Sequence, residues 1–326
     1  MEVTRLDSLQ IGQHALPLPV YFPSISSVKT ELRPEDYLQV LSSLVGLNGQ
    51  FLVSAFDLDA FGNPDRVAQM LRAAREAGAV MLMDSGNYES FWKDAQYGWT
   101  QTAFHKVLGT YSFDIAFGFD EQHPPTDFSE HLALVIARWR EDQAAAGDCL
   151  IVPIVHGTAN ALPTLCAAVV AETGVPMVAV PERRLGDGVV SRAHAVDAIR
   201  RELNKQGRYV ALHLLGTGNP ISIALYTAMG ADSFDGLEWC QTVVDHDTAQ
   251  LFHLSQADFF AGQTRWSDAG LSFHARTLAH NLEFYLAWMQ GLRTAISNGS
   301  VADFCRYNFP DRIFRQCATT FGWRSL

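Results

Sequence analysis

The chain has 326 residues, of which 48% are hydrophobic and 18% are charged. This composition allows a large core and excludes a disordered chain, and the length suits one (β/α)8 barrel with an insertion or a tail. The formal net charge of −11 argues against a broadly basic nucleic-acid-binding protein. Seven arginines balance seven acidic residues in 240–326, so the excess negative charge lies in 1–239. A polyanion is therefore expected to meet the C-terminal third or a local arginine cluster.

Cellular location is inferred from three features of the sequence. No apolar run approaches the roughly 20 residues that a membrane span needs. The first ten residues are charged and lack the apolar centre of a signal peptide. The five cysteines are odd in number and show no CxxC spacing, which fits a reducing compartment. We therefore expect a cytoplasmic protein that does not contact a membrane.

Eight short apolar segments of strand length follow one another along the chain, most of them separated by capped helices. Their hydrophobicity is continuous rather than alternating, which is typical of parallel strands covered by helices. Eight such strands close a barrel, and an open doubly wound sheet is the alternative. The expected strands are 19–23, 51–54, 80–83, 115–119, 150–155, 177–180, 209–215 and 231–234.

Cap residues predict where several helices begin and end. Asn219, followed by proline, predicts a helix that Gly230 closes. Ser129 is expected to begin a long helix, and Ser191 is expected to cap another. Residues 271–298 predict a long helix that is broken or bent near His280. We expect a barrel in 1–239 that carries the site, and an extension in 240–326 that packs on the barrel and is helical from about 271.

Polar residues end most of the predicted strands. In a barrel these ends meet at one mouth, where carboxylates suit metal binding, acid/base or nucleophilic chemistry, or recognition of N–H donors. Each residue also has a structural interpretation, since Asp is a common loop residue and helix cap and a histidine is often part of a core. Six strand ends carry such groups: Asp84, Asp120 with Glu121, His156, Glu182, Gly216-Thr217-Gly218 and Asp235.

Three further features have two interpretations each. Tyr88 suits stacking on a planar ligand or packing at the barrel rim. The GTG turn at 216–218 suits phosphate binding or a tight strand-to-helix turn. Asp245-His246-Asp247, with His253 following, has the composition of a metal site but no recognised spacing.

Six short motifs occur in a fixed order along the chain. They are PVYFP at 19–23, DSGNY at 84–88, FDE at 119–121, LGTGNP at 215–220, GADSFD at 230–235 and AHN at 279–281. Together they resemble the motifs of the tRNA-guanine transglycosylases, also called queuine tRNA-ribosyltransferases. The resemblance runs over about residues 14–310, which is nearly the whole chain.

The resemblance implies an irregular (β/α)8 barrel and a base-exchange reaction, in which guanine leaves a nucleotide in RNA and a 7-deazaguanine replaces it. Matched by motif, Asp235 is the expected nucleophile on C1′ of the ribose and Asp84 the general acid/base. Asp120 is expected to accept N–H donors of the purine and Tyr88 to stack on it. His156 stands where the family usually has a glutamine that contacts the base. Four more residues are expected to line the base site: Ser85, Glu182, Leu215 and Gly216.

The sequence departs from the family at four places. One is Asn87, which stands where the family's DSGG(F/Y) motif has its second glycine. The family's zinc site is CxCxxC followed by the histidine of the HN motif, and only Cys240 remains between Asp235 and His280, so we predict no zinc and no other cofactor. The arginine-containing loop that grips the anticodon is replaced by GLEW at 236–239. The Gly-Gly-Leu segment that closes over the base is replaced by VPERR at 180–184.

These departures leave several functions open. The first is a transglycosylase-like enzyme, a pentosyltransferase, that exchanges or removes a guanine or 7-deazaguanine base on tRNA, on DNA or on a free nucleoside. The second is a non-catalytic subunit or binding protein that partners an active enzyme, and the third is an unrelated barrel hydrolase. A homodimer and a heteromeric partner are both compatible with the sequence.

Overall fold

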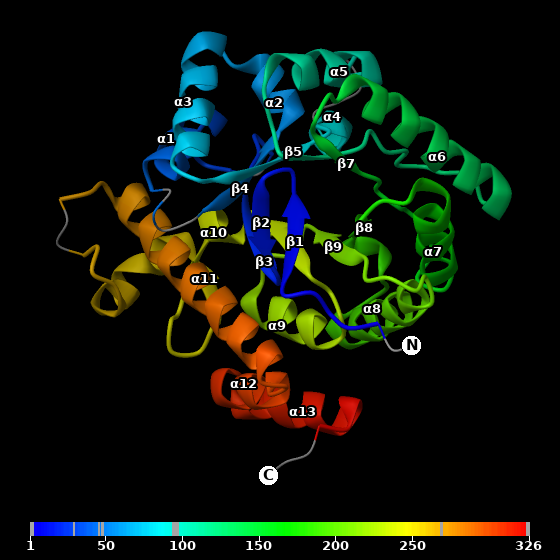
Figure 1. The fold of residues 1–326 in the computed structure, drawn as a ribbon. Coiled ribbons are helices and arrows are strands. Elements are labelled where there is room, and N and C mark those ends of the chain that lie inside the picture. Colours follow the sequence, from blue (N-terminus) through cyan, green and yellow to red (C-terminus); the bar gives the residue numbers. More distant parts are fainter. Residues whose placement is uncertain are drawn as a thin grey trace.

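The computed structural model describes residues 3–28, 30–44, 46, 49–92, 98–267 and 270–323. Eight parallel strands form one nearly closed sheet with helices around it, so the chain is α/β with a (β/α)8 TIM-type barrel and a C-terminal helical extension (Figure 1). This confirms the predicted fold class. The barrel strands are β3 (Val20–Ile25), β4 (Gln50–Ser54), β5 (Val80–Asp84), β6 (Ile115–Phe117), β7 (Leu150–Val152), β8 (Met177–Pro181), β9 (Ala211–Leu215) and β10 (Ser233–Gly236).

The strands pair in the order β7-β6-β5-β4-β3-β10-β9-β8. Closure comes from β8 and the segment after β7, where Ala179 receives a hydrogen bond of 2.8 Å from Val155 N–H and donates one of 3.0 Å to the carbonyl of Pro153. The first and last barrel strands are paired in register, with Asp235 opposite Phe22. The carboxyl ends of all eight strands therefore meet at one mouth of the barrel.

Helices surround the strands and bury the outer faces of the sheet (Figure 1). Each packs an apolar face on the strands because the strands carry apolar side chains on both sides. The helices of the barrel are α1 (Pro34–Ser43), α2 (Ala55–Ala60), α3 (Pro64–Glu76), α4 (Asn87–Trp92), α5 (Gln101–Thr110), α6 (Phe128–Ala145), α7 (Leu162–Thr173), α8 (Val189–Asn204), α9 (Pro220–Ala228) and α10 (Glu238–Gln241).

The predicted helix starts are confirmed at one position and shifted at two others. The side chain of Asn219 accepts hydrogen bonds from the backbone at the start of α9, as its place before Pro220 predicts. The cap of α6 is Asp127 rather than Ser129, because the Asp127 carboxylate accepts from the first free N–H groups of that helix. Helix α8 begins at Val189, so Ser191 lies inside its first turn instead of capping it.

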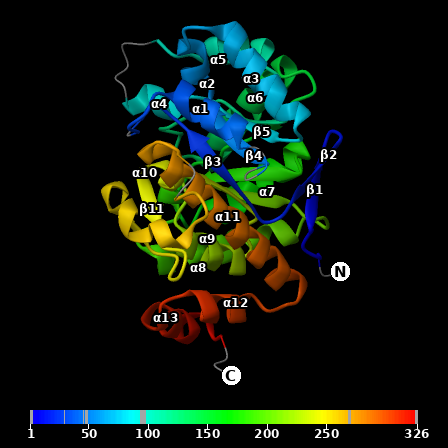
Figure 2. The same ribbon diagram turned by 90° about the vertical axis from the view of Figure 1, so that its left-hand side faces the viewer.

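A hairpin that the sequence analysis missed closes the other end of the barrel. It consists of β1 (Ser8–Ile11) and β2 (His14–Pro17) and lies in front of the barrel centre in Figure 1 and on the side away from α4 in Figure 2. Its apolar side chains Leu9 and Leu16 belong to the same buried cluster as Leu82 and Phe117 of the barrel interior. The amino ends of the strands are therefore covered, and the carboxyl ends carry the accessible mouth.

The extension packs one long helix against the barrel. The sequence predicts a helix that is broken or bent near His280. Helix α11 runs without a break from Phe273 to Ser297, so a break at that position is wrong. It is anchored by Tyr285, whose hydroxyl donates to the carbonyl of Gly218 over 2.6 Å, and by Arg293, which donates to the carbonyl of Pro19 over 3.0 Å. The other elements are β11 (Thr242–Val244), β12 (Leu251–His253), the 3-10 helix Leu254–Gln263, α12 (Val301–Asn308) and α13 (Asp311–Phe321).

Within the described ranges, no helix has both the length and the apolar character needed to cross a membrane.

Candidate active site

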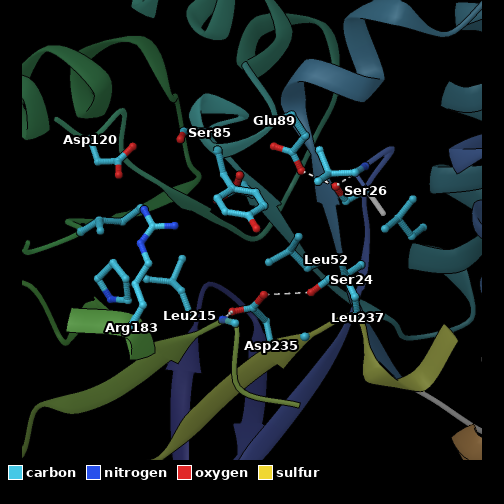
Figure 3. Close-up of a pocket in the computed structure, with 18 of the residues that line it drawn as sticks. Ser24, Ser26, Leu52, Ser85, Glu89, Asp120, Arg183, Leu215, Asp235 and Leu237 are labelled. Carbon is cyan, nitrogen blue, oxygen red and sulfur yellow. Dashed lines mark hydrogen bonds between the residues drawn. The ribbon is translucent and has the colours of Figure 1, made fainter. Parts of the chain in front are cut away.

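A cavity of about 340 Å³ opens at the carboxyl ends of the strands, the end where barrel enzymes carry their chemistry. Its lining comes from β3, β4, β5, β8, β9, β10 and the segments that follow the strands. Figure 3 shows Asp235 and Asp120 on different sides of it. Five carboxyl side chains belong to the described residues of this lining. The acidic residues and the histidine that line it are Asp84, Glu89, Asp120, His156, Asp235 and Glu238.

Asp235 is the last residue but one of β10 and is only 8% exposed. Three donors hold its carboxylate. Ser24 Oγ donates to Oδ2 over 2.9 Å, while His213 Nε2 and the N–H of Gly216 lie 3.0 and 3.1 Å from Oδ1. Because each oxygen has two lone pairs, Oδ2 keeps one lone pair free. Asp235 is therefore an oriented carboxylate with an oxygen available to an electrophile.

Asp84 ends β5 and faces the same cavity. Its Oδ2 accepts a hydrogen bond of 3.0 Å from the N–H of Gly86. Burial raises the pKa of Asp84 well above its usual range, and the nearby carboxylate of Glu89 adds to the rise. A carboxyl with a raised pKa keeps its proton toward neutral pH, so Asp84 can donate a proton there.

Gly86 lets the chain turn tightly after Asp84. Its φ is +79°, and a Cβ at this position would lie 2.5 Å from the backbone nitrogen of Phe56. No side chain fits there without moving the backbone. The glycine therefore fixes the path that brings Ser85 and Tyr88 to the cavity.

Asp120 and His156 form a hydrogen-bonded pair on one wall, with 2.5 Å between Nε2 and Oδ2. Gln122 donates to the same carboxylate oxygen over 2.6 Å. Asn87, which replaces the second glycine of the family motif, donates from Nδ2 to Oδ1 of Asp120 over 3.1 Å and to its carbonyl over 2.8 Å. The asparagine thus ties the turn after Asp84 to the neighbouring wall of the cavity.

Five other residues that the sequence analysis assigned to the base site are placed as follows. Tyr88 lines the cavity, with the guanidinium of Arg183 5.6 Å from its ring centre. Ser85, Leu215 and Gly216 also line it. Glu182 is not part of the lining.

The carboxylate of Glu182 is engaged by the outer helices. Oε1 accepts from the Tyr226 hydroxyl over 2.8 Å and lies 3.0 Å from Arg192 Nη1. This pairing with α8 and α9 holds it away from the cavity, so the geometry does not support the expected base contact.

Sequence reasoning missed Glu89, a carboxyl that is 3% exposed and lines the cavity. Ser26 Oγ donates to its Oε1 over 2.7 Å, as Figure 3 shows. Burial, with the charge of Asp57, raises the pKa of Glu89 to about 7. The available signal was its position five residues after Asp84, in the loop and helix that follow a strand end.

Glu238 was also missed as a site residue. Its Oε2 packs on two glycines, and a Cβ at Gly218 or at Gly236 would overlap with this oxygen. Burial raises the pKa of Glu238 to about 7. The cavity therefore holds three carboxyls with raised pKa values, and Arg183 is the only arginine or lysine among the described residues of its lining.

Cys240 and His280, the two residues that the resemblance links to a zinc site, bond to backbone carbonyls. Cys240 Sγ donates to the carbonyl of Leu237 over 3.2 Å, and His280 Nε2 donates to the carbonyl of Val244 over 2.7 Å. Burial lowers the pKa of His280 to about 4, and its ring stacks on His246 with 4.1 Å between centres. No group of three His, Cys, Asp or Glu able to hold a metal occurs in the part of the chain that the structure describes. These residues do not fit a tetrahedral zinc site.

No protein-family model matches the chain. No curated protein matches it either.

Proposed function

We propose that this chain is a transglycosylase-like enzyme, a pentosyltransferase, that exchanges or removes a guanine or 7-deazaguanine base on a nucleic acid, tRNA or DNA. The reaction passes through a covalent aspartyl–ribose intermediate. The observation that carries this proposal is that two carboxyls with different surroundings line one cavity. Asp235 is held by three hydrogen-bond donors, and Asp84 has a raised pKa. The barrel itself is not an argument, because it supports many chemistries.

In the first step, Asp235 acts as the nucleophile. An oxygen of its carboxylate attacks C1′ of the ribose, and the bond from C1′ to the base nitrogen breaks. The electron pair of that bond goes to the base nitrogen, which takes the proton of Asp84. The raised pKa of Asp84 supports this role, because the group must be protonated before the base leaves.

In the second step, the roles reverse. The incoming base gives its N–H proton to the carboxylate of Asp84, and its nitrogen attacks C1′ while the bond to Asp235 breaks. Water in place of the incoming base gives removal instead of exchange. Two displacements on C1′ retain its configuration, as in retaining glycosidases.

Recognition of the base is assigned to Asp120, His156 and Tyr88. The Asp120 carboxylate can accept only, so it suits the N–H donors of a guanine-type ring. His156 orients that carboxylate through the bond of 2.5 Å. Tyr88, on the same side of the cavity as Arg183, offers a ring for stacking.

The test is an exchange assay with labelled guanine and labelled 7-cyano-7-deazaguanine. The purified chain is incubated with total tRNA, with duplex DNA and with free guanosine, because the acidic lining of the cavity suits an uncharged nucleoside as well. We expect label in one of the three, and loss of that label with Asp235→Ala and with Asp84→Asn.

Two outcomes contradict the proposal. If label transfer persists in Asp235→Ala, Asp235 is not the nucleophile. Absence of transfer with all substrates favours the alternative, a non-catalytic subunit of an active partner. In that case calorimetry should show that the chain binds neither base.

A further inference from the structure

A buried histidine lies directly beneath the candidate nucleophile. His213 belongs to β9, has no exposed surface, and pairs in the sheet with Ser233 of β10. Its ring centre lies 4.6 Å from that of Phe117 and 6.5 Å from that of Phe22. The ring therefore fills the barrel interior and cannot reach a ligand, so any part it plays passes through Asp235.

Both ring nitrogens of His213 have partners. Nδ1 lies 2.7 Å from Ser233 Oγ, and Nε2 lies 3.0 Å from Asp235 Oδ1. A carboxylate can only accept, so Nε2 carries the hydrogen. In the neutral ring, Nδ1 then accepts from the Ser233 hydroxyl, which fixes the tautomer and the ring orientation.

The two oxygens of Asp235 are consequently different. Oδ1 accepts from both His213 and the N–H of Gly216, which uses both of its lone pairs. Among the described residues, Oδ2 accepts only from Ser24. One lone pair of Oδ2 remains for an electrophile, whereas Oδ1 has none.

We propose that His213, held by Ser233, is a positioning residue that directs attack to Oδ2 of Asp235 and then makes the Asp235 carboxylate a good leaving group. This inference rests on the proposed function. It adds which oxygen bonds to C1′ and which group controls breakdown of the covalent intermediate.

The movement of electrons explains why His213 would make the Asp235 carboxylate a good leaving group. Attack by Oδ2 forms the C1′–Oδ2 bond and makes Oδ1 the carbonyl oxygen of an ester, which still accepts from His213 and Gly216. When the incoming nitrogen attacks C1′, the electron pair of the C1′–Oδ2 bond returns to the carboxylate. Donors already aimed at Oδ1 stabilise the negative charge that develops there.

Loss of His213 must therefore act unequally on the two steps. The donor stabilises the ionised carboxylate, which is the reactant of the first step and the product of the second. Its removal makes Asp235 a worse leaving group, which slows the second step. The attacking carboxylate also loses a stabilising hydrogen bond, and this loss does not make it less reactive in the first step. The covalent intermediate should accumulate.

The experiment measures the fraction of enzyme trapped as the adduct during turnover, by acid quench and intact-mass analysis, on the substrate that the exchange assay identifies. His213→Phe keeps a buried ring without a donor, and His213→Gln returns an N–H near the place of Nε2. Ser233→Ala removes only the group that orients the ring. Thr227→Val is the matched control, since Thr227 is a fully buried residue of α9 that is not part of the cavity lining.

We expect His213→Phe to slow turnover by about 10- to 100-fold, the usual effect of one hydrogen bond to a charged group, and to raise the adduct fraction. His213→Gln should restore part of the turnover, Ser233→Ala should lie between, and Thr227→Val should match the wild type. A merely structural role would lower turnover without raising the adduct fraction. If His213→Phe does not fold, His213→Gln and Ser233→Ala still test the inference through the same fraction.

An unchanged adduct fraction in the folded His213 and Ser233 variants overturns this inference and leaves the proposed function intact. A wild-type chain that forms no adduct and exchanges no base overturns the proposed function, and this inference with it.

Discussion

Ser24 donates a hydrogen bond of 2.9 Å to Oδ2 of Asp235, and the two residues are 211 positions apart in the chain. The bond joins β3, the first barrel strand, to β10, the last, at the floor of the cavity (Figure 3). Closure of the barrel and orientation of the candidate nucleophile therefore depend on the same pair of strands. A change that loosens β3 against β10 is expected to affect the site before it affects the rest of the core.

Glu89→Gln should remove a pH-dependent loss of stability. The pKa of Glu89 rises from its usual 4.5 to about 7 in the folded protein. The folded state thus holds a proton that the unfolded chain loses, and the free energy of unfolding falls as the pH rises from about 4.5 to about 7. A rise of this size corresponds to at most about 3 kcal/mol.

Urea unfolding of the wild type and Glu89→Gln at pH 5 and pH 8 measures this effect. The variant should gain stability relative to the wild type on going to pH 8. The matched control is Glu172→Gln, at an exposed position of α7, which should show no such gain. Parallel pH dependence in the wild type and Glu89→Gln would contradict the assignment.

Asp120→Asn should weaken base binding. The amide presents an N–H₂ group where a guanine-type ring needs an acceptor, and it also disturbs the bond to His156. Loss of a hydrogen bond to a charged group corresponds to roughly 10- to 100-fold in affinity. Calorimetry with guanine measures this change, with Asp148→Asn at an exposed position as the control. Equal affinity in the wild type and Asp120→Asn would remove Asp120 from the recognition surface.

Gly86→Ala should destabilise the fold as well as the site. Its φ of +79° and the 2.5 Å approach of Phe56 N to a Cβ both oppose a side chain. We expect a loss of at least about 1–3 kcal/mol in the free energy of unfolding. Gly174→Ala is the control, because its φ of +69° has the same sign but open space surrounds it. Similar losses at both positions would show that the close contact with Phe56 contributes nothing.

Metal chelation should leave the protein unchanged. Cys240 and His280 bond to the backbone, and the described residues around them do not form the ligand set of a structural zinc site. Prolonged treatment with a strong chelator is expected to leave the melting temperature within error, and metal analysis of the purified chain should find zinc well below one ion per chain. A drop in melting temperature that zinc reverses would contradict this.

The barrel was predictable because its strands and helix starts are marked by short stretches of sequence. Most of the eight strands are apolar runs such as Met177–Pro181, whose five residues are all buried, and several helices begin at cap residues such as Asn219. The expected break in α11 was wrong because Asn281 bonds to the backbone of Trp239, Thr242 and Val244 instead of interrupting its own helix. Those partners lie about 40 residues away, where no local pattern records them.

Some of the site residues were likewise predictable from local sequence, and others were not. Asp84, Asp120, His156 and Asp235 were predictable as strand ends that a barrel brings together. His213 was not, because it lies inside β9 and its function depends on Ser233 and Asp235 of the neighbouring strand. Glu182 follows directly after β8, but its carboxylate bonds to Tyr226 and Arg192, and these contacts depend on the packing of α8 and α9.

The most direct test of the central claim is a search for a covalent adduct at Asp235. Wild type, Asp235→Asn and Asp235→Ala are incubated with tRNA, DNA and guanosine, denatured, digested with protease and analysed by mass spectrometry. We predict a ribose-linked adduct on the peptide that contains Asp235 in the wild type and none in either variant, with both variants folded as judged by circular dichroism. An adduct on another residue, or one that persists in Asp235→Ala, would contradict the account.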